Sequence, residues 1–114
     1  MRQEARLREA LHELRERTGS RVERLEGELE DLARTRRSGS DDDEHDPEGV
    51  PLSAEWSRLV GLLESARADA HQVDDALRRL AAGGYGICAG CGEPIPVERL
   101  EARPFAERCV PCAS

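Results

Sequence analysis

This chain of 114 residues contains no lysine and only four aromatic or methionine side chains. Its aromatic residues are Trp56, Tyr85 and Phe105, and its single methionine is Met1. This scarcity excludes a large globular core and limits the chain to one small domain. No apolar run approaches the roughly twenty residues of a membrane span, so we expect no membrane segment. The N-terminus shows no apolar run typical of a signal peptide, so we expect a cytoplasmic protein with reduced thiols.

Negative charge is concentrated in one short stretch. The net charge is −7, and residues 41–48 hold six acidic residues and no basic one. The rest of the chain has eighteen acidic residues against seventeen arginines, which is close to neutral. A chain whose acidic and basic residues are balanced in this way lacks the excess of positive charge that nucleic-acid binding requires. We therefore expect no direct, specific DNA binding.

Two segments have the apolar period of amphipathic helices, residues 1–37 and 53–82. The first has apolar residues at steps of three and four, with Thr18 in one gap of the stripe: Leu7, Leu11, Leu14, Val22, Leu25, Leu29 and Leu32. The second repeats the same steps: Trp56, Leu59, Leu63, Ala66, Ala70, Val73, Leu77 and Leu80. Ser53 is the expected N-cap of the second helix. Acid–arginine pairs four residues apart should line the outer faces, among them Glu4–Arg8, Glu30–Arg34, Asp74–Arg78 and Asp75–Arg79.

The two apolar stripes match when the helices are paired antiparallel. Leu32 then faces Trp56, Leu25 faces Leu63, and Leu11 faces Leu77, with the layers between them also paired. We therefore predict an all-α fold, a long antiparallel two-helix coiled coil in a monomer. The alternative is that each helix packs on a partner chain.

All four cysteines lie in the last segment, residues 83–114. They form two pairs, Cys88–Cys91 and Cys109–Cys112, each with two residues between, and seventeen residues separate the pairs. This spacing is typical of a site with four thiolates around one Zn²⁺. Because every ligand position is protein, the zinc should be structural, not catalytic. The alternative is two disulfides. Around the metal, Ile95, Leu100 and Phe105 are the expected small core.

The acidic stretch falls where the predicted hairpin reverses, in a loop over residues 38–52. The apex is Asp43, Glu44, His45 and Asp46, roughly 45 Å of helix away from the zinc. A solvated linker is the simpler interpretation, although the loop is longer than two helices need. A calcium-binding loop is disfavoured because no glycine follows at the required position.

The C-terminal segment resembles the zinc finger of the DksA/TraR family of bacterial transcription factors. The shared pattern consists of Tyr85-Gly86, Cys88, Cys91-Gly92, Ile95, Arg99-Leu100, Ala102, Pro104, Cys109 and Cys112. The resemblance implies a protein that binds RNA polymerase through its secondary channel and places an acidic coiled-coil tip near the active site. Longer members have a D-x-x-D-x-A tip; here Asp43 and Asp46 fit, and Glu48 replaces the alanine.

The resemblance also makes the alarmone ppGpp a candidate ligand. In longer members, segments before the coiled coil and after the last cysteine help form its site. This chain starts in the coiled coil, so joint action with ppGpp is left open. We expect a regulator and not an enzyme. Two other functions stay open: a helper of transcript cleavage, like the Gre factors, that steadies Mg²⁺ with tip carboxylates, and a DNA-binding zinc-finger protein.

Overall fold

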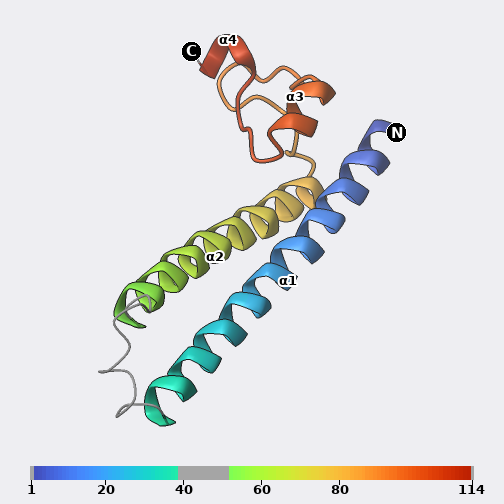
Figure 1. Ribbon diagram of the computed structural model, residues 1–114. Coiled ribbons are helices and arrows are strands. Elements are labelled where there is room, and N and C mark those ends of the chain that lie inside the picture. The colour runs from blue at the N-terminus through green and yellow to red at the C-terminus, as the bar shows by residue number, and fades with distance from the viewer. Residues whose placement is uncertain (1, 39–51, 114) are drawn as a thin grey trace. The chain divides into compact units, whose positions relative to one another are not determined.

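A computed structural model of the chain describes residues 2–38 and 52–113 (Figure 1). The described residues form four helices, α1 (Arg2–Ser38), α2 (Leu52–Ala82), α3 (Val97–Ala102) and α4 (Val110–Ala113). Within the described ranges there is no strand, only an isolated bridge between Ile87 and Pro94. The predicted all-α fold class, with two long helices ahead of a cysteine-bearing finger, is confirmed. None of the described helices is long and apolar enough to cross a membrane.

The ends of α2 follow from local sequence. Gly83, with φ of 85°, takes the left-handed conformation that commonly ends a helix. The N–H groups of Gly84 and Tyr85 then both donate to the carbonyl of Arg79, at 2.8 and 3.1 Å. At the other end α2 begins at Leu52, so Ser53 lies inside the helix. The prediction that Ser53 caps the helix is therefore wrong, and the difference lies within the one or two residues by which helix ends usually vary.

The described chain divides into two compact units, residues 18–68 and residues 1–17 with 69–114. In the unit of residues 18–68, the α1 and α2 segments run antiparallel (Figure 1). Its core is Leu25, Leu59, Leu63 and Ala66, flanked by Val22, Leu29 and Leu32. These are the side chains that the matched stripes predict. Across the pair, Arg67 donates to Glu26 at 2.7 Å, and Arg36 lies over the Trp56 ring at 5.9 Å.

The other unit combines the first turns of α1, the last turns of α2 and the finger. Its core contains residues of all three: Leu11, Ala76, Leu80, Tyr85, Cys88, Ile95 and Leu100. Ala76 is fully buried, whereas the predicted Leu77 is only partly buried against this core. Phe105 is half-buried and lies outside the core, so its prediction as a finger core residue is wrong. Tyr85 takes that place, because its ring is buried and its hydroxyl donates to the Pro104 carbonyl at 2.9 Å.

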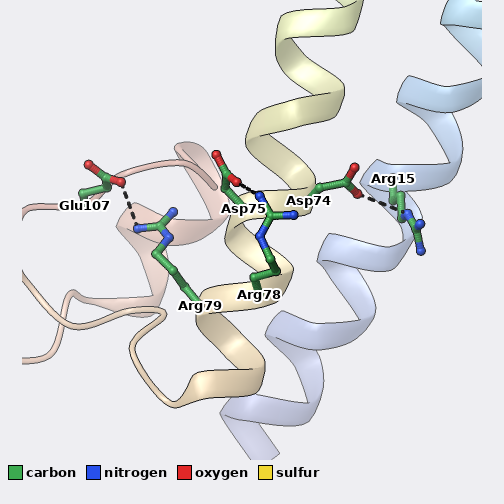
Figure 2. Close-up of polar contacts among 6 residues, drawn as sticks. All are labelled: Arg15, Asp74, Asp75, Arg78, Arg79 and Glu107. Atoms are coloured by element: carbon green, nitrogen blue, oxygen red, sulfur yellow. Dashed lines mark hydrogen bonds and ion pairs between the residues drawn. The ribbon is translucent and has the colours of Figure 1, made fainter.

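The ion pairs of α2 differ from the predicted ones (Figure 2). Asp74 pairs with Arg15 of α1 at 3.4 Å, and Arg79 pairs with Glu107 of the finger at 3.3 Å. Arg78 pairs with Asp75, three residues earlier on the same helix. The predicted pairs Asp74–Arg78 and Asp75–Arg79 are therefore replaced. Tertiary packing brings Arg15 to Asp74 and Glu107 to Arg79, and Asp75 and Arg78 then pair with each other. On α1, the pair Glu4–Arg8 does form, at 3.5 Å.

Candidate metal centre

The first cysteine pair lies in a tight turn held by backbone hydrogen bonds. The Cys88 N–H donates to the Glu93 carbonyl at 2.8 Å, and the Gly92 N–H donates to the Cys88 carbonyl at 2.9 Å. Gly92 closes this turn with φ of 77°, a conformation that side-chain-bearing residues rarely adopt. Just before it, the Gly86 carbonyl accepts from the Ile95 N–H at 2.7 Å. The turn therefore directs both sulfurs of the pair to the same side.

The second cysteine pair lies at the start of α4, with Cys109 directly before the helix and Cys112 within it. The Ala113 N–H donates to the Cys109 carbonyl at 3.0 Å, so one helical turn sets the spacing of Cys109 and Cys112. The two pairs approach closely at Gly90. A Cβ atom on Gly90 would lie 3.1 Å from both Cβ and Sγ of Cys112. Glycine at position 90 thus leaves the space that the second pair occupies.

The four sulfurs gather around one point. Their Sγ atoms all lie within 4.8 Å of one another, and the Sγ atoms of Cys91 and Cys109 are 3.8 Å apart. A tetrahedron of thiolates with Zn–S bonds of about 2.3 Å has edges of about 3.8 Å. The four cysteines are free thiols, not disulfides. This donor set fits one structural Zn²⁺, as the sequence predicts, and it is the only metal-ligand group found among the described residues.

Backbone N–H groups prepare Cys88 to act as a thiolate. The N–H groups of Cys109 and Gly90 each donate to its sulfur at 3.3 Å. Hydrogen bonds from the backbone of Cys109, then Cys91, lower the pKa of the Cys88 thiol to about 6. Hydrogen bonds with Cys109, then Cys88 and Cys91, raise the pKa of Cys112 to about 12. Four thiolates therefore coexist here only when a cation neutralises them, which Zn²⁺ does by deprotonating its ligands outright.

The surroundings of the site suit a structural metal. Cys88 is 2% exposed and belongs to the core with Tyr85, Ile95 and Leu100, whereas Cys91 is exposed. Burial raises the pKa of the Tyr85 hydroxyl, although Arg79 nearby opposes this. Because four sulfurs fill the tetrahedron, no position is left for a reacting water. The metal holds the finger together.

The structure brings together one of the two predicted sets of site residues. The four cysteines meet at one point, as described above. The tip set lies outside the described residues: Asp43, Glu44, His45 and Asp46. Sequence reasoning missed the contacts of Arg79 and Glu107, and no local signal could have found them because the two residues lie far apart in the chain.

Comparisons with known proteins agree with this geometry. A family model described as the prokaryotic dksA/traR C4-type zinc finger matches residues 83–114. An uncharacterised protein of Haemophilus influenzae is 48% identical over 61 residues, which are 54% of this chain and 80% of that protein. The RNA polymerase-binding transcription factor DksA of Caulobacter vibrioides is 54% identical over 39 residues, 34% of this chain and 28% of that protein. The match to DksA is thus confined to less than a third of its length.

A solved structure extends the similarity along the chain. The structure of transcription factor DksA2 from Pseudomonas aeruginosa matches with a TM-score of 0.78 and 31% sequence identity. The match covers 99% of this chain and 81% of that one. Similarity at this level of identity and coverage extends well beyond the finger. Together with four cysteines arranged for one zinc, it shows that the chain belongs to the DksA/TraR family of C4-type zinc-finger proteins.

Proposed function

We propose that this chain is a regulator of transcription that binds RNA polymerase and catalyses no reaction itself. The match to transcription factor DksA2 over 99% of the chain carries the proposal. Proteins named RNA polymerase-binding transcription factor DksA, from Caulobacter vibrioides and Haemophilus influenzae, add shorter matches of 39 and 41 residues. In this proposal the protein acts as a cytoplasmic monomer.

Each part of the chain has its own role in the proposal. The finger, residues 83–114, is the base, and its zinc is held by Cys88, Cys91, Cys109 and Cys112. The helices of residues 1–37 and 53–82 carry the loop of residues 38–52, which enters the secondary channel of the polymerase. There the tip residues lie near the active site: Asp43, Glu44, His45 and Asp46.

The chemistry of the tip supports a regulatory role. Carboxylates are hard oxygen ligands that interact with Mg²⁺ and with basic side chains, both of which surround a site of phosphoryl transfer. In a confined channel of low effective dielectric, removing two negative charges has a larger effect than it has in water. We therefore assign the effect on transcription to the tip, and most of the binding affinity to the helices and the finger.

The decisive experiment changes Asp43 and Asp46 to asparagine together. The double variant should keep its zinc, its helix content and its affinity for the polymerase, but lose its effect on transcription. Asparagine is nearly the same size as aspartate, so a loss cannot come from packing. Binding and transcription are measured on the same protein preparations. Unchanged regulation would make the loop a linker, and parallel loss of binding and activity would make the tip an anchor.

Further measurements separate this function from its alternatives. Competition with a protein already known to occupy the secondary channel tests the location of binding. Release of RNA from stalled complexes would indicate a helper of transcript cleavage, and a gel shift of DNA without polymerase would indicate direct DNA binding. The charges exposed on the finger disfavour direct DNA binding, because acidic and basic side chains are mixed on its surface: Glu93, Glu98, Glu101 and Glu107 with Arg103 and Arg108. Repeating the transcription assay with ppGpp shows whether the alarmone acts jointly.

A further inference from the structure

Arg79 contacts both chain segments of the finger from the last turns of α2. Its backbone carbonyl accepts from the N–H groups of Gly84 and Tyr85, which lead to the first cysteine pair. Its guanidinium lies over the Tyr85 ring at 5.9 Å. It also pairs with the Glu107 carboxylate at 3.3 Å (Figure 2). Glu107 lies just before the second cysteine pair. One side chain of α2 thus links the two halves of the metal centre.

The segment that Arg79 contacts is also where the cysteine pairs are joined. The Glu107 carbonyl accepts from the N–H of Ala89, inside the first pair, at 2.8 Å. Two residues later, the Cys109 N–H donates to the sulfur of Cys88 at 3.3 Å. A shift of Glu107 therefore moves Cys109 and loosens a hydrogen bond to the buried thiolate.

We infer that Arg79 is a positioning residue for the zinc site, and that it increases zinc affinity by holding Glu107 in place. Its Nε atom is buried and has no hydrogen-bond partner in the described part of the chain. An unpaired buried N–H is unfavourable, so the other contacts of the guanidinium must hold it there. The neighbouring pair Arg78–Asp75 joins two residues of α2 (Figure 2), which makes it the matched control.

The test is zinc affinity, measured by competition with a chromogenic chelator on free protein, so the result does not depend on polymerase binding. Arg79→Met keeps an unbranched side chain of similar helix propensity but removes the charge and the contact with Glu107. The side chains of Arg79 and Glu107 are 31% and 66% exposed, so solvent weakens the pair. From a partly screened ion pair and one cation–π contact, we expect affinity to fall about fivefold.

Two further variants test the mechanism. Glu107→Ala should lower zinc affinity about threefold, and the double variant should lose no more than Arg79→Met alone, because both changes break the same contact. Arg78→Met should leave zinc affinity unchanged. Equal losses in Arg78→Met, or losses that multiply in the double variant, would overturn the inference.

A second measurement excludes a simple loss of helix. Without zinc, Arg79→Met and the parent should have the same helix content by circular dichroism, since the substitution acts through the metal centre. If the metal-free variant is less helical, Arg79 supports α2 and not the zinc site. In a rescue experiment, Arg79→Glu should lose affinity and the exchange Arg79→Glu with Glu107→Arg should recover part of it. Failure of this rescue would show that the ion pair has no role.

Discussion

Replacing Gly90 with alanine should weaken zinc binding by about tenfold or more. The new Cβ would lie 3.1 Å from both Cβ and Sγ of Cys112, about 0.3 Å closer than the 3.4 Å at which ordinary contacts begin. Zinc–ligand distances tolerate about ±0.2 Å, so Cys112 cannot move aside while it stays bound. Overpacking of this kind costs about 1–3 kcal/mol. Since 1.4 kcal/mol corresponds to tenfold, the middle of that range exceeds a tenfold loss.

The assay is competition for zinc with a chelator of known affinity, together with metal analysis of protein purified without added zinc. The parent should retain one equivalent, and Gly90→Ala should lose it to a weaker chelator. Gly27→Ala is the control, because it adds the same methyl group where no atom lies within 4 Å. If Gly90→Ala binds zinc as tightly as the parent, the metal does not hold Cys112 in place, and the assignment of four sulfurs to one ion fails.

Four other outcomes are expected. Gly27→Ala should stabilise the protein by about 1 kcal/mol, because alanine is more favourable than glycine in a helix interior and the added methyl group meets open space here. The thermal unfolding midpoint should therefore rise, and a lower midpoint would contradict this. Cysteines at Leu25 and Leu63 should crosslink within one chain, since both side chains lie in one buried cluster, whereas crosslinks only between chains would show pairing with a partner. Cys88→Ser should abolish zinc binding and unfold the finger, which nuclear magnetic resonance spectra can follow; a folded, zinc-loaded variant would contradict the ligand set. Zinc affinity should fall as pH falls, because protons compete with the metal for the thiolates. The fall should become steeper below about pH 6, because the lowered pKa of Cys88 keeps it a thiolate above that pH and it takes up a proton below it. A titration of zinc affinity against pH that shows no such change of slope would refute the role of Cys88.

Much of this fold is determined by short-range patterns that can be read without a structure. The spacing of the cysteines predicts a shared metal, because a turn with two residues between the cysteines of a pair directs both sulfurs to one side. The apolar steps of three and four in α1 and α2 determine which faces are buried. Their matched layers also predict the core that Leu25 and Leu63 share in the unit of residues 18–68. These features depend on spacing along the chain, so tertiary structure confirms them and does not alter them.

Tertiary structure alone decided which residues meet where elements distant in sequence converge. Ala76 is buried and Leu77 only partly so, because the last turns of α2 share one core with both α1 and the finger. The apolar stripe of α2 predicts the face that packs on α1, but it does not predict the face that packs on the finger. Tyr85 is buried where Phe105 was expected, since its hydroxyl reaches the Pro104 carbonyl. Tertiary structure also decided the ion pairs Arg15–Asp74 and Arg79–Glu107. A long arginine side chain reaches several carboxylates, and only the packing of the elements sets which one is near.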